Sequence, residues 1–359
     1  MGKTEQKSLI MCDIGTNYIK TIKATTLFVV FLFVHSWEQR KAKELFNSTA
    51  DKGYPELPVL SATQDRGMIR RDENSINVFH NKSNEIGYKR VLPGQFVIVR
   101  TNEDSERIPL TISDYNREKG TITIVVQTIG AGTTMMKSLK TGDFFHDFVG
   151  PLGKPSEFCS ESIDELKKKS IIFVAGGLGT APVYPQVKWL HEHGISADVI
   201  IGAKTKDLLI YEDEMKAVAG NLYVTTDDGS YGRSGMVTTT LKDLVEKEGK
   251  TYTTCVAIGP MIMMKFVCLT TKELGIPTIV SMNPIMVDGT GMCGACRLTV
   301  GGEVKFACVD GPEFDGHLVD FDQAMKRQAI YKTAEGRAFL KLQEGDTHHG
   351  GCGNCGGDK

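Results

Sequence analysis

The sequence is short of net charge, of long apolar runs and of repeats. Its 359 residues carry a formal net charge of −2, so neither a nucleic-acid partner nor binding to an anionic membrane surface is expected. The strongly apolar run Leu27–Val34 spans only eight residues, whereas a membrane-spanning helix needs about 20. Twenty-six residues of mixed polarity precede it, which is a poor layout for a signal peptide. A buried strand accounts for the run better.

Cysteine is present without the pattern of a disulfide framework. Nine cysteines in a chain of this length, several at metal-ligand spacing, fit a reducing compartment better than an oxidising one. We therefore expect a cytoplasmic protein. At 359 residues the chain is also too long for one ordinary core, so two or three domains are expected.

The most specific pattern lies in the segment 286–317. Cys293 and Cys296 are separated by two residues, and Cys308 follows after eleven more. Asp288 precedes Cys293 with four residues between them. Plant-type [2Fe–2S] clusters use C-x4-C-x2-C and a distant fourth Cys, and here Asp stands in place of the first Cys. Because ferric iron accepts oxygen ligands as well as thiolates, the spacing predicts a [2Fe–2S] site formed by these four residues.

The surrounding residues suit such a site. Glycines in the loop reach backbone angles that other residues avoid, and they let backbone N–H groups approach sulfur. The run Leu298–Ala307 has the pattern of two strands joined by Gly301-Gly302, and such a hairpin would return Cys308 to the loop. The loop glycines are Gly289, Gly291 and Gly294.

Other interpretations of the cysteines stay open. Two cysteines two residues apart can form half of a zinc site or a redox motif. A zinc ribbon needs a second such pair, and the other pair, Cys352 and Cys355, lies in a Gly-rich tail that we expect to be solvated. If Asp288 only caps a turn, Cys268 is the leading substitute as fourth ligand.

Residues 61–157 have the pattern of an antiparallel β-barrel. Short runs of alternating polarity are separated by turn residues such as Pro93-Gly94 and Thr141-Gly142. The expected strands are Ser75–Phe79, Gln95–Arg100, Thr121–Thr128 and Asp143–Val149.

Two segments of this region have groups that could bind a diphosphate and a flat ring. Arg107 can pair with a diphosphate, and Thr111 can hydrogen-bond the edge of a ring. Later, a Gly-Ala-Gly-Thr-Thr segment ends at Thr134, ahead of an expected short helix Met135–Leu139. Its N–H groups and hydroxyls, with the helix dipole, form a candidate anion site. Each signal is weak alone, because such an arginine is usually a solvated charge and Gly-Ala-Gly is usually a turn.

Residues 165–282 change to strands that alternate with helices. The apolar run Ile171–Ala175 is followed by Gly-Gly-Leu-Gly-Thr and by a helix that ends near His193, with Pro182 in its first turn. Such alternation argues for a parallel sheet covered by helices on both faces. Further strands are expected at Asp198–Gly202, Leu222–Thr226, Cys255–Gly259 and Thr278–Met282, and further helices near Glu212–Ala219, Val237–Lys247 and Met261–Leu274.

Three loops follow strands of this sheet, where parallel sheets bind their ligands. The first departs from strict G-x-G-x-x-G, so it is a weak dinucleotide signal, and glycines that only let a strand and a helix pack closely are an equal alternative. The choice between NADH and NADPH is open: Arg233 could bind a 2′-phosphate, whereas Asp227 and Asp228 favour NADH. The loops are Gly176–Thr180, Thr226–Arg233 and Gly259–Met261.

The order of the three regions supports one function. The chain has three regions in order: an antiparallel region with an Arg…Thr element, an α/β region with Gly-rich loops, and an iron–sulfur loop. Together they could form a path for electrons. A nicotinamide supplies two electrons as hydride, a flavin passes them on singly, and an iron–sulfur centre accepts one at a time. We therefore predict an oxidoreductase that uses these three groups.

The chain resembles the ferredoxin–NADP⁺ reductase superfamily, specifically its branch with a C-terminal [2Fe–2S] domain. It is most similar to the small subunits of NADH-dependent reduced ferredoxin:NADP⁺ oxidoreductases, also called sulfide dehydrogenase beta subunits. Dihydroorotate dehydrogenase electron-transfer subunits are near relatives. The resemblance covers about Gly67 to Gln328, and its most specific motifs are Arg107–Ile112, Phe148–Gly153 and Val287–His317.

The resemblance implies a set of binding residues. The Arg-Ile-Pro-Leu-Thr element and the Gly-Thr loop hold FAD in that superfamily, which implies Arg107, Pro109, Leu110, Thr111, Gly132, Thr133 and Thr134. The Gly-rich and Gly-Pro loops line the site for NAD(H) or NADP(H), which implies Gly177, Gly179, Thr180, Asp227, Gly259 and Pro260. Small subunits of this kind can hold a cluster with one Asp and three Cys, which match Asp288, Cys293, Cys296 and Cys308; the dihydroorotate branch has four Cys.

The predicted protein is multidomain. Its parts are an N-terminal extension of unclear role (1–60), an FAD-binding antiparallel β-barrel (61–157), an NAD(P)-binding α/β domain with a parallel sheet (165–282), a small [2Fe–2S] cluster domain (283–330), and a C-terminal helix with a Gly-rich tail (331–359). In the extension we expect strands at Leu9–Ile14 and Thr26–Val34 and a helix at Trp37–Phe46.

The predicted function is that of an NAD(P)H-dependent flavin oxidoreductase subunit. It would pass electrons between NAD(H) and a larger FAD/[4Fe–4S] flavoprotein subunit, with ferredoxin reached through that subunit, in ferredoxin:NAD(P) electron bifurcation. No side chain is predicted as an acid–base catalyst, because hydride transfer needs stacked rings at the correct distance rather than a proton donor. Two alternatives stay open: an electron-transfer subunit of another dehydrogenase, such as dihydroorotate dehydrogenase, and a zinc-stabilised, non-catalytic binding module.

Overall fold

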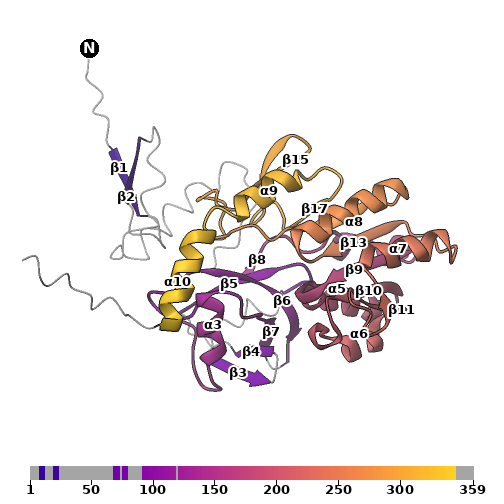
Figure 1. Cartoon of the computed structure of the whole chain (residues 1–359), viewed down its shortest axis with the longest axis horizontal. Helices are drawn as coiled ribbons and strands as arrows, with labels where there is room; N and C mark the ends of the chain where they lie inside the picture. The colour runs from indigo at the N-terminus through magenta and orange to yellow at the C-terminus, as the bar shows by residue number, and fades with distance from the viewer. Residues whose placement is uncertain are drawn as a thin grey trace, which may run out of the picture. The chain divides into compact units, whose positions relative to one another are not determined.

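The computed structural model describes residues 91–118 and 120–344, together with the backbone of four short strands earlier in the chain (Figure 1). The chain divides into two compact units, Met1–Ser61 and Ala62–Lys359. In the first unit β1 (Ser8–Cys12) pairs antiparallel with β2 (Ile19–Lys23), and the predicted strand Leu9–Ile14 overlaps β1. The strand predicted at 26–34, the helix predicted at 37–46 and the Gly-rich tail with its two cysteines lie outside the described residues.

A six-stranded antiparallel sheet begins the second unit, in the spatial order β3-β4-β7-β6-β5-β8. Two predicted strands are confirmed, and the third ends at Val125 rather than at Thr128. The fourth begins at Asp147, because Asp143 instead accepts the backbone N–H of Lys140 and closes a turn. No pairing of β3 with β8 is seen among the described residues, so closure into a barrel stays a prediction. The strands are β3 Met68–Asp72, β4 Ser75–Phe79, β5 Phe96–Arg100, β6 Ile108–Asn116, β7 Thr121–Val125 and β8 Asp147–Leu152.

β5 is buried on both faces and so separates two cores. Successive side chains of a strand point to opposite faces. Val97 and Val99 lie in the core of the antiparallel sheet, whereas Phe96 and Ile98 lie in a core shared with the C-terminal part of the chain. The helix α3 (Ala131–Ser138) contributes to the first of these cores and begins four residues before the predicted start at 135.

A seven-stranded sheet follows, in the order β12-β11-β10-β9-β13-β14-β17. All its pairings are parallel except that of β17 with β14. The five predicted strands are confirmed to within one residue at each end. They are β9 Ile171–Gly176, β10 Ala197–Ala203, β11 Asn221–Thr226, β13 Thr254–Ile258 and β14 Thr278–Ser281, and the additional strands are β12 Arg233–Ser234 and β17 Glu313–Asp315.

Helices cover both faces of this sheet, as predicted (Figure 1). Phe173 of β9 packs in the core that includes side chains of α5 and α6, whereas its neighbours Ile172 and Val174 pack in the core that includes α7 and α8. The helices are α5 Thr180–Glu192, α6 Glu212–Val218, α7 Val237–Glu246 and α8 Met261–Glu273, with short turns η4 Glu157–Ser160, α4 Ile163–Leu166, η5 Gly177–Gly179 and η6 Lys206–Leu208.

The C-terminal segment is joined to the wound sheet by β17. The predicted hairpin is confirmed as β15 (Arg297–Val300) paired with β16 (Glu303–Phe306). It is followed by α9 (Phe321–Gln328) and α10 (Lys332–Glu344), and α10 lies beside α3 (Figure 1). Across the described part of the chain, no helix combines the length and apolarity that a membrane span requires.

Candidate functional site

The predicted thiol ligands lie in the loop before β15 and just after β16. The sulfurs of Cys296 and Cys308 are 3.3 Å apart and share a hydrogen bond. Backbone N–H groups approach two sulfurs: that of Ala295 lies 3.5 Å from Cys293 Sγ, and that of Cys308 lies 3.5 Å from Cys296 Sγ. The hairpin thus returns Cys308 to the loop as predicted. Hydrogen bonds of this kind tune iron–sulfur clusters.

Asp288 caps the same loop. Its two carboxylate oxygens accept the backbone N–H groups of Thr290, at 3.0 Å, and of Cys293, at 2.9 Å. A carboxylate oxygen that accepts one hydrogen bond has a second lone pair for a metal. The two roles considered from the sequence, ligand and turn cap, are therefore compatible at Asp288.

The two thiols of the close pair differ in acidity. The hydrogen bond with Cys308 lowers the pKa of Cys296 to about 7. The same hydrogen bond, followed by burial, raises the pKa of Cys308. Iron is bound by thiolates, so cluster binding would release the protons that these sulfurs carry.

Cys268, the substitute ligand, does not lie in this loop. It is on α8, where a Cβ on Gly316 would lie 2.5 Å from its sulfur, and burial raises its pKa to about 12. In the described part of the chain no three His, Cys, Asp or Glu side chains already stand at metal-binding distance. The paired sulfurs, the N–H···S contacts and the adjacent carboxylate nevertheless fit an iron–sulfur cluster, around which the side chains of Cys293 and Asp288 would turn inward.

The loop packs directly on the antiparallel sheet. Gly289 has φ +76°, and a Cβ there would lie 2.7 Å from the side chain of Leu152 and 2.9 Å from that of Ile98. Only glycine combines this backbone angle with so close an approach. The sequence thus places the cluster loop against β5 and β8.

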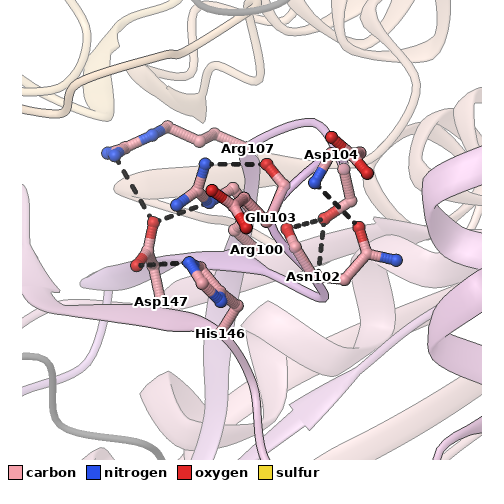
Figure 2. Close-up of polar contacts among 8 residues, drawn as sticks. Arg100, Asn102, Glu103, Asp104, Arg107, His146 and Asp147 are labelled. Carbon is pink, nitrogen blue, oxygen red and sulfur yellow. Dashed lines mark hydrogen bonds and ion pairs between the residues drawn. The ribbon is translucent and has the colours of Figure 1, made fainter.

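The predicted flavin residues begin at the start of β6. Arg107 Nη2 lies 3.5 Å from Asp147 Oδ2, and Arg100 Nε lies 2.7 Å from the same oxygen. His146 Nε2 is 3.9 Å from the other oxygen. Figure 2 shows the two guanidinium groups converging on Asp147. Sequence reasoning missed Asp147, which lies 40 residues after Arg107.

This cluster has the chemistry for an anionic ligand. Two guanidinium groups share one carboxylate, and Nε of both Arg100 and Arg107 is buried without a hydrogen-bond partner among the described groups, although Arg100 Nε lies within ion-pair distance of Asp147. A buried donor of this kind is costly, and a diphosphate would supply both acceptor and charge, so the residues fit FAD. The other predicted flavin residues of this segment are half-buried on β6 and pair with β5: Pro109, Leu110 and Thr111.

In the second predicted flavin segment the helix begins earlier than predicted. Because α3 begins at Ala131, Gly132, Thr133 and Thr134 lie in its first turn rather than before it. The hydroxyl of Thr133 is already used, since it accepts the N–H groups of residues 129 and 130. The N–H of Gly132 donates to Glu106 Oε1 at 3.2 Å. The Glu106 contact brings α3 beside the start of β6 and had no signal in the sequence.

The predicted dinucleotide loops meet at the carboxyl ends of β9 and β13. A Cβ on Gly179 would lie 2.1 Å from Ile258 O, and a Cβ on Gly259 would lie 3.1 Å from Gly176 O. The buried Thr180 donates its hydroxyl to Gly177 O at 3.0 Å. The chain leaves β9 toward β10 on one side and returns to β13 on the other, which is the switch point where such sheets bind ligands. Pro260 follows Gly259 there.

Asp227 lies apart from these glycines, on the loop after β11, with β10 between the two strands. It is exposed. Arg233, at the other end of that loop, forms an ion pair with Glu248 at 2.8 Å and lies over the ring of Tyr223. The basic residue considered for a 2′-phosphate is therefore already engaged.

Glu313 is a further polar group that the sequence did not reveal. Its Oε1 accepts hydrogen bonds from Ser156 Oγ, at 2.7 Å, and from Gln186 Nε2, at 2.8 Å. Ser156 follows β8, Gln186 lies on α5 and Glu313 begins β17, so one carboxylate joins three segments. Burial raises its pKa to about 7.

A cavity of about 620 Å³ opens at the opposite end of the wound sheet. Its lining includes Ile171, Thr254 and Thr278, which begin β9, β13 and β14, with Lys169 and His317 beside them. Parallel sheets bind ligands at their carboxyl ends. This cavity is therefore not part of the predicted dinucleotide site.

Comparison with known proteins agrees with this arrangement. Residues 283–320 match the iron–sulfur cluster binding domain of dihydroorotate dehydrogenase B, and residues 173–269 match the oxidoreductase NAD-binding domain. An uncharacterized protein of Clostridium beijerinckii is 66% identical over 272 residues, which cover 76% of this chain and 92% of that protein. A Thermotoga maritima homologue of the dihydroorotate dehydrogenase B electron-transfer subunit is 48% identical, covering 69% and 84%.

Among solved structures, a chain from the NADH-dependent reduced ferredoxin–NADP oxidoreductase is 41% identical to this chain. The match has a TM-score of 0.69 and covers 79% of this chain and 100% of the other. The chain is therefore an NAD-binding flavin oxidoreductase subunit with a C-terminal iron–sulfur domain. The zinc-stabilised, non-catalytic module does not agree with these matches.

The chain belongs to the family of dihydroorotate dehydrogenase B electron-transfer subunits and their homologues. The predicted cofactors, FAD, an iron–sulfur cluster and a nicotinamide dinucleotide, are confirmed at this level. A subunit of this kind transfers electrons to or from a catalytic partner subunit, which confirms the general part of the partner prediction.

Proposed function

We propose that this chain passes electrons between NAD(H) and a larger FAD/[4Fe–4S] flavoprotein subunit, in an enzyme that couples ferredoxin to NAD(P) by electron bifurcation. The observation that carries this proposal is the match with the ferredoxin–NADP oxidoreductase chain over its entire length. When bound, the cofactors supply hydride acceptance from nicotinamide and one-electron transfer onward. The cytoplasmic location expected from the cysteines is part of this proposal.

The residues of the chain have separate tasks in this scheme. Gly179 and Gly259 let the loops after β9 and β13 pack closely together, and the dinucleotide would bind beside them at the switch point of the sheet. Arg107 would bind the FAD diphosphate. The loop of Asp288 would hold a [2Fe–2S] cluster, and because this loop packs on β5, the cluster would lie on the same side of the chain as the proposed flavin site. In this proposal residues 61–157 bind FAD, residues 165–282 bind the nicotinamide dinucleotide and residues 283–330 bind the cluster.

Asp288 supports the ferredoxin-linked function over dihydroorotate oxidation, because the resemblance associates one Asp and three Cys with the former. Purification under anaerobic conditions with the natural partner tests this. A large subunit containing FAD and [4Fe–4S] clusters is expected. A colourless preparation without flavin, iron or acid-labile sulfide would end the proposal.

A second candidate is the electron-transfer subunit of a dihydroorotate-type dehydrogenase. The family model matched by residues 283–320 and the name of the Thermotoga maritima relative favour it. Co-purification separates the two candidates, because this one requires an FMN-containing dehydrogenase as partner.

The ligand role of Asp288 has its own test, electron paramagnetic resonance of the reduced protein. Asp288→Asn retains an oxygen that can cap the loop but loses the charge, so we expect an altered spectrum and loss of iron, and an altered spectrum with iron retained for Asp288→Cys. Asp310 also caps a turn, accepting the Phe306 N–H at 2.7 Å. Asp310→Asn should therefore leave the spectrum unchanged. A wild-type spectrum in both Asp288 variants would remove Asp288 from the ligand set.

A further inference from the structure

Asp147 is the carboxylate that Arg100 and Arg107 share at the predicted flavin site (Figure 2). Its side chain is 23% exposed, and those of Arg100 and Arg107 are 15% and 25% exposed. Water therefore screens these charges only in part. The position of Asp147 is fixed by strand pairing, because Asp147 of β8 lies opposite Arg100 of β5.

Arg107 depends on this carboxylate more than Arg100 does. Arg100 Nε lies 2.7 Å from Asp147 Oδ2, and Arg100 Nη1 also donates to the backbone oxygen of Glu103 at 3.1 Å. The 3.5 Å contact with Asp147 is the one ion pair or hydrogen bond of the Arg107 side chain among the described groups, and Nε of both arginines lacks a hydrogen-bond partner there. In Figure 2 the guanidinium groups of Arg107 and Arg100 approach the Asp147 carboxylate from opposite sides.

Charge decides what holds Arg107 there. Two guanidinium groups directed at one oxygen repel each other, and the carboxylate between them offsets that repulsion. Without it, Arg107 would turn toward solvent, because Arg100 has a second anchor and would keep its place.

We propose that Asp147 is a positioning residue for the flavin: it holds Arg107 so that its remaining N–H groups point to the FAD diphosphate. The inference rests on the proposed function, because it requires Arg107 to bind that diphosphate. The charge of Asp147 also repels the ligand. Placement outweighs this repulsion, because two guanidinium groups face the single charge of Asp147, whereas a guanidinium–phosphate contact is charge-assisted and directional.

Titration of the full chain, freed of flavin, with FAD tests the proposal through flavin fluorescence. Asp147→Asn keeps the side-chain size and removes the charge, so the dissociation constant should rise about tenfold. Asp147→Glu restores the charge and should recover most of this loss. In an Arg107→Ala background, Asp147→Asn should cause no weakening, because only the repulsion is left to remove.

Asp104→Asn is the matched control, since it removes the same charge from the turn beside Arg100. It should change FAD affinity less than twofold, roughly the effect of an exposed charge. Thermal unfolding of each variant without flavin checks folding, and Asp147→Ser serves as a second neutral variant.

Two results would overturn the inference while leaving the proposed function intact. Equal weakening by Asp147→Asn with and without Arg107 would mean that Asp147 acts through packing. Tighter FAD binding by the single variant Asp147→Asn would mean that Asp147 competes with the diphosphate for Arg107. By contrast, failure of the wild-type chain to bind FAD would overturn the proposed function and this inference with it.

Discussion

The candidate dinucleotide site is built from backbone, whereas the candidate flavin site is built from charged side chains. At the ends of β9 and β13, Gly179 approaches the backbone of Ile258. At the starts of β6 and β8, the arrangement depends on the ion pairs of Asp147. Backbone in a central sheet has little freedom to move, while charged side chains can rotate. Substitutions should therefore damage the first site through the fold and the second through affinity.

Gly179→Ala tests the backbone half of this comparison and should have the largest effect. The new Cβ would lie 2.1 Å from Ile258 O and 2.6 Å from the carbonyl carbon, and neither atom can move without shifting β13. We expect the free energy of unfolding to fall by about 3 kcal/mol, measured with urea, together with loss of NADH binding.

Gly130→Ala is the matched control on the flavin side. Nothing lies within 4 Å of the Cβ that it adds, and the φ of −127° at Gly130 is ordinary for any residue. The free energy of unfolding should change by no more than about 0.5 kcal/mol. Equal losses in the two variants would contradict the distinction between the regions.

Glu313→Gln tests the junction between the two regions. Burial raises the pKa of Glu313 from 4.5 to about 7, and Glu157 adds repulsion. The folded protein therefore holds this proton more tightly than the unfolded chain does. The protonated Glu313 carboxyl therefore contributes to the free energy of unfolding. This contribution is fully present below pH 4.5 and is lost as the pH rises to about 7.

The glutamine variant has no such proton to lose. Relative to wild type, it should gain about 2 kcal/mol of unfolding free energy between pH 5 and pH 8, measured by urea unfolding at each pH. Glu165→Gln, at an exposed carboxylate paired with Lys168, should follow the wild-type pH dependence. Parallel profiles for Glu313→Gln and wild type would show that Glu313 is ionised in the folded protein throughout this range.

Five of the seven strands of the parallel sheet could be predicted, because the central strands are buried on both faces; β12 and β17 are short and gave no such signal. The central strands are continuous apolar runs that end at glycine or at polar loops, and Ile171–Gly176 is buried throughout. The cysteine spacing likewise predicted the contact of Cys296 with Cys308. In both cases the signal lies in adjacent or closely spaced residues.

The flavin side could be predicted only in part because its contacts are distant in sequence. Asp147 lies 40 residues from Arg107, and Glu313 lies 157 residues from Ser156. The start of α3 was misjudged because Gly-Ala-Gly has the composition of a turn. The contact of Gly132 with Glu106, 26 residues earlier, accompanies the extra helical turn.

The smallest expected effect concerns the choice between NADH and NADPH. This choice depends on charged side chains beside the glycine loops of the candidate dinucleotide site. The exposed carboxylate of Asp227 would accept a hydrogen bond from a ribose hydroxyl and would repel a 2′-phosphate. Arg233, in contrast, is held in an ion pair with Glu248. We therefore expect a preference for NADH. Asp227→Ser should lower the ratio of kcat/KM for NADH to that for NADPH about tenfold, measured with an artificial electron acceptor.

Glu248→Gln sharpens this test without changing the loop that bears Asp227. It breaks the ion pair of Arg233 and leaves the ring of Tyr223 as its described neighbour. Arg233 can then reach a 2′-phosphate, so kcat/KM for NADPH should rise about twofold to threefold, as an exposed charge contact allows, while kcat/KM for NADH stays constant. If neither substitution moves the ratio, the ribose does not bind beside the loop after β11, and the glycines at β9 and β13 alone define the dinucleotide site.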